Sequence, residues 1–186
     1  MNKDSSKDFQ LIIEGCCQRH RSSQNALYRL YYPYAMSVCI RYTESNAEAI
    51  SVVNDGFLKV FNNIKKFGTD RPFKPWFRRI LINTAINHVK KQKKVKKEVA
   101  MDEARTVPYS EDVLSQINYR ELIALVQSLS QSYRTVFNMY VIDGYKHREI
   151  AQILGISVST SKSNLTRARV KLQELVSAKL NDSYVR

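Results

Sequence analysis

The chain has 186 residues, of which 44% are hydrophobic, so it can bury a core and form one or two domains. Its five glycines and four prolines are too few for a collagen-like, disordered or turn-rich all-β chain. Lys and Arg number 30 against 17 Asp and Glu, a net charge of +13, and no apolar run approaches the ~20 residues of a membrane span. The polar start lacks a secretory signal, and the three cysteines have no zinc-like spacing. We therefore expect a cytoplasmic, helix-rich protein that binds a polyanion and is not membrane-inserted.

Four amphipathic helices are predicted in the first half of the chain, because apolar residues recur there every three or four positions. Their approximate ranges are 9–16, 26–39, 46–67 and 74–91. Pro33 is expected to kink the second helix. Ser45 and Glu48 form a capping-box sequence at the start of the third helix, and Gly68 ends it.

The positive charge is concentrated in the first half. Residues 1–97 carry 19 Lys and Arg against 7 Asp and Glu, whereas residues 98–186 carry 11 against 10. Six of the eight residues 90–97 are lysines, which favours phosphate binding, although a solvated helix end is an alternative. The acidic stretch that follows has few large apolar residues and is interrupted by Pro108. We predict a helical domain over 1–93, a linker over 94–112 and a second helical domain over 113–186.

Four further helices are predicted at about 113–129, 133–143, 150–154 and 161–175. No segment shows the alternation of a strand, so the expected fold class is all-α. The segment Arg148–Thr160 has the form of a helix-turn-helix. Ala151 is small where the helices cross, Gly155 supplies a left-handed turn, and Ser157 caps the next helix. The second helix of such a motif enters the major groove of DNA.

This second helix presents short hydroxyls, an amide and cations, which are the groups that read base edges and contact phosphates. An ordinary polar face in a helical bundle is the alternative. The expected DNA-binding residues are Ser159, Thr160, Lys162, Ser163, Asn164, Arg167 and Lys171.

A second candidate interface lies in the loop and helix before the linker, where aromatic residues are interspersed with cations and amides. Unpaired bases stack on aromatic rings while cations hold the backbone, and an Asn amide can read a base edge. The alternatives are that the aromatic residues belong to the core and that the amides are only solvated. The expected DNA-binding residues are Phe67, Arg71, Phe73, Arg78, Arg79, Asn83, Asn87, Lys90 and Lys91.

The third helix carries a mixed polar and apolar face formed by Asn54, Asp55, Phe57 and Leu58. Because the Asp carboxylate repels phosphate, such a face suits a protein partner better than a nucleic acid. A solvated polar edge is the alternative.

These motifs resemble the bacterial sigma-70 family of RNA polymerase sigma factors, of the small extracytoplasmic-function (ECF) type. The segment 27–33 resembles the opening helices of the family, and 54–61 resembles region 2.2, which docks on the β′ clamp helices of core RNA polymerase. The segment 75–87 is similar to regions 2.3–2.4, which melt DNA and read the −10 element. The segment 133–169 is similar to region 4, which reads the −35 element and contacts the β flap.

The resemblance implies an initiation factor that is not an enzyme and that needs no cofactor, metal or small-molecule substrate. Its expected partners are core RNA polymerase, promoter DNA and an anti-sigma factor. One competing hypothesis is a stand-alone helix-turn-helix transcriptional regulator that binds duplex DNA by itself. Another is an interaction protein, either a polymerase-binding adaptor or an anti-sigma-like protein.

Several residues depart from the usual pattern of the family. Asn54 stands at a usual Gln, and Gly56 stands where Val or Thr is common. Ser161 and Asn164 replace a common Val and Arg on the second helix of the helix-turn-helix. These last departures bear on which promoter sequence is read.

Overall fold

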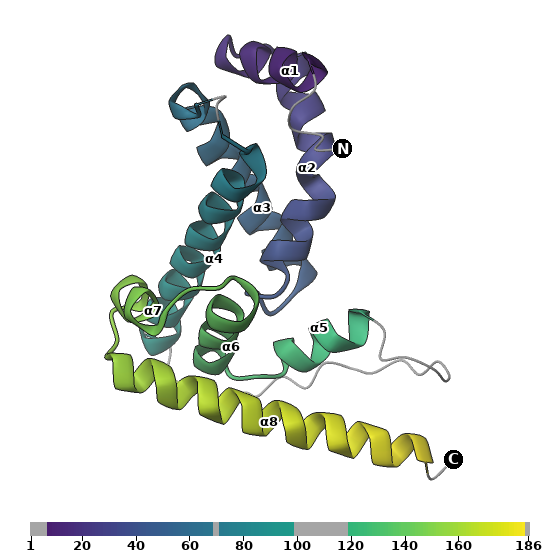
Figure 1. Cartoon of the computed structure of the whole chain (residues 1–186), viewed down its shortest axis with the longest axis vertical. Coiled ribbons are helices and arrows are strands. Elements are labelled where there is room, and N and C mark those ends of the chain that lie inside the picture. Colours follow the sequence, from purple (N-terminus) through teal and green to yellow (C-terminus); the bar gives the residue numbers. More distant parts are fainter. Residues whose placement is uncertain (1–6, 69–70, 99–118, 185–186) are drawn as a thin grey trace. The chain divides into compact units, whose positions relative to one another are not determined.

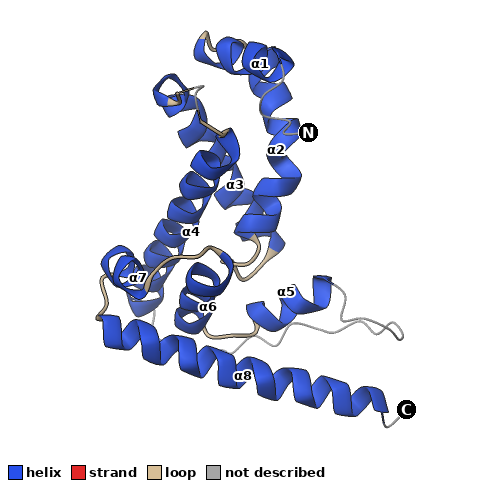
Figure 2. Cartoon of the chain, in the orientation of Figure 1, coloured by secondary structure: helices blue, strands red, loops and turns tan. Residues whose placement is uncertain are grey.

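The computed structural model of the chain describes residues 7–68, 71–98 and 119–184, with side chains over 7–68, 71–92 and 121–178. Within these ranges the regular structure is helical, without a strand, so the predicted all-α class is confirmed (Figures 1 and 2). The chain divides into two compact units, Met1–Lys91 and Gln92–Arg186. Each unit buries its own set of hydrophobic side chains.

The first unit contains α1 (Lys7–Cys17), α2 (Arg21–Cys39), α3 (Asn46–Asn63), a 3-10 turn (Ile64–Lys66) and most of α4 (Phe73–Glu98), whose last residues lie beyond the boundary of the unit. Pro33 lies inside α2, and the helix continues through it. The predicted cap of α3 is confirmed, since the Ser45 hydroxyl accepts a hydrogen bond of 3.2 Å from the amide of Glu48. The Glu48 carboxylate in turn accepts a bond of 3.0 Å from the amide of Glu44. The first bond satisfies an amide that the first turn of the helix leaves without an intrahelical partner, and the second holds the chain just before the cap.

Aromatic rings form the centre of the first unit. Phe73, the first residue of α4, is fully buried, and its ring centroid lies 5.5 Å from those of Phe9 and Phe77. The ring of Tyr31 lies 4.8 Å from Phe73. Aromatic pairs at such separations contribute about 0.5–1.5 kcal/mol each beyond the area they bury. The start of α4 is thereby anchored in the core.

The helices α3 and α4 approach each other closely at Gly56. A Cβ atom at this position would lie 2.7 Å from Cδ2 of Leu81, a side chain that is itself fully buried. Protein interiors are close-packed, so a larger residue here must displace its neighbour. The missing side chain of Gly56 therefore sets the spacing of the two helices.

The helix α4 is longer than the sequence predicts. The predicted end lies near Lys91 and the predicted linker begins at residue 94, but residues 94–98 are helical. The reason is composition, because no Gly or Pro interrupts the helix after Pro75 and Lys, Gln and Glu are good helix formers. The rest of the predicted linker, 99–112, lies outside the described residues.

The second unit contains α5 (Tyr119–Gln127), α6 (Gln131–Phe137), a π-helical turn (Asn138–Ile142), α7 (His147–Leu154) and α8 (Val158–Tyr184). Residues 113–118, where a helix is predicted to begin, lie outside the described residues. The predicted helix over 133–143 is regular only as far as Phe137. The π-helical turn follows, closed by a bond of 2.9 Å from the amide of Asp143 to the carbonyl of Asn138. The buried core of this unit includes Leu129, Val136, Met139, Ile150, Leu165 and Ala168.

Candidate nucleic-acid interface

The predicted helix-turn-helix is formed by α7, a short turn and α8. Gly155 adopts φ 70° and ψ 38°, the left-handed conformation that only glycine takes without strain. The amides of Gly155 and Ile156 donate to the carbonyl of Ala151 at 2.9 and 3.0 Å. The Ser157 hydroxyl accepts a bond of 2.9 Å from the amide of Thr160 and so caps α8. The predicted turn and cap are therefore confirmed.

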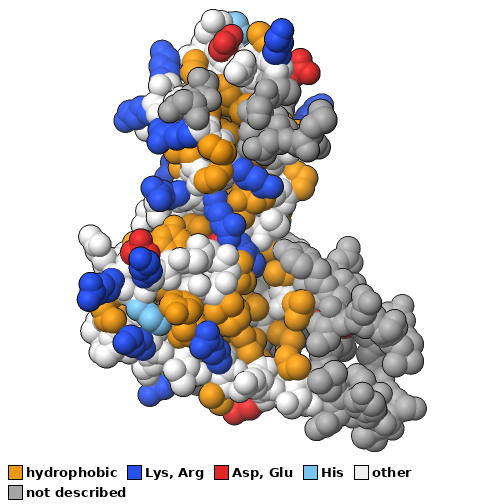
Figure 3. Space-filling model, in the orientation of Figure 1, with side chains coloured by type: hydrophobic (Ala, Val, Ile, Leu, Met, Phe, Trp, Pro, Cys, Tyr) orange, Lys and Arg blue, Asp and Glu red, His pale blue; other side chains and the backbone are white. Residues whose placement is uncertain are grey.

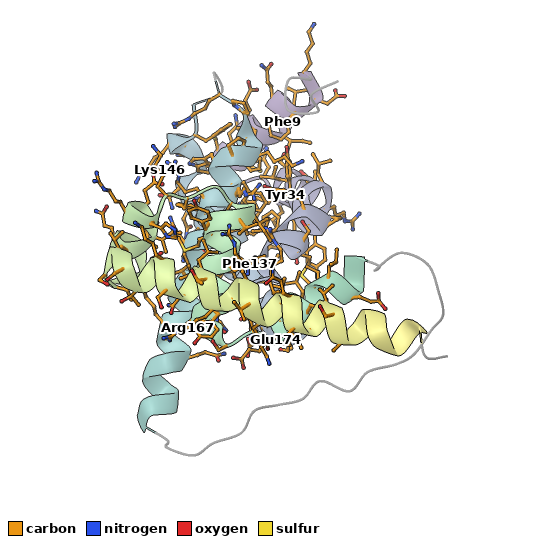
Figure 4. The ribbon with its side chains drawn as sticks, turned by 60° about the horizontal axis from the view of Figure 1, so that its bottom comes forward. Phe9, Tyr34, Phe137, Lys146, Arg167 and Glu174 are labelled. Carbon is orange, nitrogen blue, oxygen red and sulfur yellow. The ribbon has the colours of Figure 1, made fainter. Side chains whose placement is uncertain are left out.

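Most of the predicted DNA-binding residues of α8 lie on its exposed side; Figure 4 labels Arg167 among them. The exposed members are Ser159, Thr160, Lys162, Ser163, Arg167 and Lys171, whereas Asn164 is half-buried. The ammonium group of Lys171 donates to the carboxylate of Glu174 at 3.1 Å. Because both side chains are exposed, this ion pair is weak, and Lys171 remains able to contact a phosphate.

The helix α4 gathers amides and cations on one side. The exposed members of the predicted set on this helix are Arg79, Asn83, Asn87, Lys90 and Lys91, which recur every three or four residues and so share one face. Arg78 is half-buried. Arg71, before the helix, is exposed, and its guanidinium donates to the carbonyl of Lys66 at 3.3 Å. Figure 3 shows Lys and Arg side chains over α4.

The two aromatic residues predicted to stack on bases are buried instead. Phe67 is 7% exposed and Phe73 is 0% exposed, with ring centroids 5.3 Å apart. The helices α1 and α2 supply Phe9 and Tyr31 as further ring partners of Phe73. A buried ring cannot offer its face to a base. The stacking role of Phe67 and Phe73 is therefore corrected, and the core interpretation of these two residues holds.

The face of α3 that is predicted to bind a protein is exposed at three of its four residues. Asn54, Asp55 and Leu58 are exposed, Leu58 by 59%. Phe57 is only 2% exposed, and its ring packs 4.6 Å from that of Tyr28. Phe57 therefore lies in the core and offers no exposed surface for the direct contact that the sequence predicts.

Tyr28 of α2 extends this surface and is not among the residues predicted from the sequence. Its hydroxyl donates a hydrogen bond of 3.0 Å to Oδ1 of Asn54, and its ring lies 5.3 Å from that of Tyr32. Burial and the neighbouring Tyr32 raise the pKa of Tyr28, so the hydroxyl remains a donor. The spacing of Tyr28 and Tyr32, four residues apart, is the signal that places both rings on one face of the helix.

Two family models match the chain. The model of sigma-70 region 2 matches residues 27–95, which include the exposed faces of α3 and α4, and that of sigma-70 region 4 matches residues 119–172, which include the helix-turn-helix. The chain belongs to the sigma-70 family. In this sigma factor, nearly all of region 2 lies in the first unit and all of the matched region 4 lies in the second.

The sigma factor is similar to relatives over most of its length. It is 23% identical to the ECF RNA polymerase sigma-E factor of Haemophilus influenzae, over 90% of this chain and 94% of the relative. It is 28% identical to the ECF RNA polymerase sigma factor SigW of Bacillus subtilis, over 78% of this chain and 84% of the relative. Its fold is similar to that of the sigma factor RpoE from Bartonella quintana, solved in complex with the anti-sigma factor NepR. The TM-score is 0.55 at 21% identity, covering 82% of this chain and 96% of that one. The chain is thus an ECF-type sigma factor.

In the part of the chain that the structure describes, His, Cys, Asp and Glu side chains form no group of three or more that could hold a metal ion, and none of the helices there has the length and hydropathy of a membrane span. Burial, with a smaller effect of Cys17, raises the pKa of Cys16 to about 11, and burial raises that of Cys39 to about 12. Both thiols are therefore protonated near neutral pH and are poor nucleophiles.

Proposed function

We propose that this sigma factor binds core RNA polymerase, directs it to promoters by reading the −35 and −10 elements, and helps to melt the DNA. The observation that carries the proposal is the presence in one chain of a helix-turn-helix and of a separate unit whose α4 exposes amides between cations. In this proposal residues 1–93 bind the core enzyme and the −10 element, 94–112 connect the two parts, and 113–186 read the −35 element.

The −35 element is read by α8 in the major groove. The hydroxyls of Ser159, Thr160 and Ser163 and the amide of Asn164 are short groups suited to base edges and nearby phosphates. Arg167 can pair with two acceptors of a guanine, and Lys162 and Lys171 contact phosphates.

The −10 element is read by the exposed face of α4. Asn83 and Asn87 offer amides to the edges of unpaired bases, while the cations around them hold the phosphates. These cations are Arg71, Arg78, Arg79, Lys90 and Lys91. Unstacking a base costs a few kcal/mol, which binding of the freed base offsets. With Phe67 and Phe73 in the core, amides and cations carry this role without them.

The core enzyme binds the surface formed by Tyr28, Asn54, Asp55 and Leu58. An exposed Leu beside an amide and a carboxylate resembles the mixed composition of a protein interface more than that of a nucleic-acid interface. The expected contacts are the β′ clamp helices for this surface and the β flap for the second unit.

The remaining assignments follow from the same function. An anti-sigma factor is the proposed regulator, by analogy with the Bartonella relative, which was solved with one. The factor acts in the cytoplasm, where polymerase and promoters meet, and is itself not an enzyme, because the covalent chemistry belongs to the polymerase.

The test is run-off transcription with purified core RNA polymerase over a library of promoter duplexes. We expect promoter-dependent transcripts only when the chain is added, and a stable complex with core enzyme in a pull-down. A stand-alone regulator would bind duplex DNA but would form no such complex. An adaptor would form the complex, but its DNA binding would not change when Lys162 and Arg167 are replaced.

A further inference from the structure

His147, the first residue of α7, joins three elements of the second unit. Its ring stacks on that of Tyr140 in the π-helical turn, with centroids 4.4 Å apart and an interplanar angle of 22°. Its Nδ1 forms a hydrogen bond of 2.9 Å with the hydroxyl of Ser161 on α8. One side chain therefore links the π-helical turn, α7 and α8, the helix proposed to read the −35 element and here called the recognition helix.

Ser161 is a polar residue whose side chain is buried. It is 0% exposed and lies on the first turn of α8. A buried hydroxyl needs a hydrogen-bond partner, and His147 provides one. The contact thus satisfies a hydroxyl that is fully buried at the start of α8.

Ser161 also lies between two residues that face outward, Thr160 and Lys162. A shift of Ser161 moves both of them, because a helix transmits a displacement to its neighbours as a rigid body. The other end of the link is held by the π-helical turn, whose widened geometry is a feature often found at functional sites.

The charges around His147 favour its neutral form. Burial, and then the nearby cations Lys162 and Arg169, lower the pKa of His147. The ring of Tyr140 and the hydroxyl of Ser161 also face the imidazole. A neutral imidazole can bond to Ser161 without adding a third positive charge to this end of α8.

We propose that His147 is a positioning residue of the recognition helix, which fixes the start of α8 through Ser161 and so sets the sequence preference at the −35 element. The inference rests on the proposed function, since it assumes that α8 reads that element.

The experiment uses holoenzyme reconstituted from core RNA polymerase and the full chain. Its probe is a library of promoter duplexes randomised at both the −35 and −10 elements, and the transcripts are sequenced. His147→Phe keeps a ring for stacking but removes the bond, leaving the buried hydroxyl unsatisfied. We expect it to lower the −35 enrichment about tenfold, with the −10 enrichment unchanged as an internal control.

Two further variants separate positioning from folding. His147→Asn can place an amide near the position of Nδ1, so we expect it to restore most of the −35 enrichment. The double variant His147→Phe, Ser161→Val replaces both polar partners by apolar groups and should recover enrichment relative to His147→Phe alone. His20→Phe, the same change at an exposed histidine of the first unit, is the matched control and should behave as wild type.

The outcomes are distinguishable. If wild type starts transcripts without any −35 preference, the proposed reading by α8 fails and the inference fails with it. If wild type shows a −35 preference that His147→Phe leaves intact, only the inference is overturned. It is also overturned if His147→Phe lowers the −35 and −10 enrichments equally, which indicates a general loss of folded protein.

Discussion

The ammonium group of Lys59 on α3 donates a hydrogen bond of 3.0 Å to the hydroxyl of Thr84 on α4. That hydroxyl donates onward to the carbonyl of Ile80 at 2.7 Å. The contact lies one turn from the close approach of Gly56 and Leu81, so a polar and an apolar contact together join the two helices. The helix proposed to bind polymerase and the helix proposed to read the −10 element are therefore held in a fixed register.

Gly56→Val should destabilise the first unit. The added side chain begins 2.7 Å from Cδ2 of Leu81, which has no free space to move into, so we expect a loss of about 1–3 kcal/mol in the free energy of unfolding. Denaturant unfolding followed by fluorescence of Trp76 measures it. Ala47→Val, an exposed position of the same helix, is the matched control. The double variant Gly56→Val, Leu81→Ala should lose less stability than the sum of the two single losses, and strictly additive losses would count against the steric explanation.

Leu58→Ala should weaken binding to core RNA polymerase and leave stability nearly unchanged, because this side chain is 59% exposed. Competition with a labelled sigma factor for core enzyme measures the affinity. Phe57→Ala provides the contrast, since removing a buried ring should cost about 3–5 kcal/mol of unfolding free energy. Unchanged competition by Leu58→Ala would remove this face of α3 from the interface.

Asn83→Ala should lower open-complex formation while core binding is retained. If the amide reads a base edge, the loss should be about 1–3 kcal/mol in the stability of the open complex. Fluorescence of a base analogue in the −10 element measures opening, and a gel-filtration assay measures core binding. Asn25→Ala, at an exposed Asn of α2, is the control. Equal losses in both assays would reject a reading role for Asn83.

Arg167→Ala should reduce −35 discrimination by about 1–3 kcal/mol if its guanidinium contacts a base. Lys162→Ala should instead weaken binding to all sequences similarly. The slope of log affinity against log salt concentration should become shallower by about one, as expected for the loss of one phosphate contact. Footprinting of the holoenzyme at several salt concentrations distinguishes the two effects. An intact −35 footprint with Arg167→Ala would contradict its assignment.

The sequence predicts those features that local chemistry determines. The turn at Gly155, the cap at Ser157 and the cap at Ser45 each depend on residues within a few positions, and the structure contains all three. The exposure of Asn83 and Asn87 likewise follows from the helical period of α4.

The parts that the sequence does not predict depend on distant partners. Phe67 and Phe73 lie in a pattern that fits both a base-stacking surface and a core, and Phe57 lies in one that fits both a protein-binding face and a core. The ring of Phe73 packs on Phe9 of α1 and Tyr31 of α2, and that of Phe57 packs on Tyr28 of α2, so helices distant in the sequence decide their burial. The end of regular helix at Phe137 is another case, because nothing in the local periodicity distinguishes a π-helical turn from an α-helix.

The two buried thiols of the first unit have a practical consequence. With pKa values of about 11 and about 12, Cys16 and Cys39 carry almost no thiolate at pH 7, and neither is accessible while the helices stay packed. An alkylating reagent can therefore reach them only when the helices separate. The rate at which these two thiols are modified therefore reports how often this unit opens. Mass spectrometry can measure that rate with polymerase absent or present.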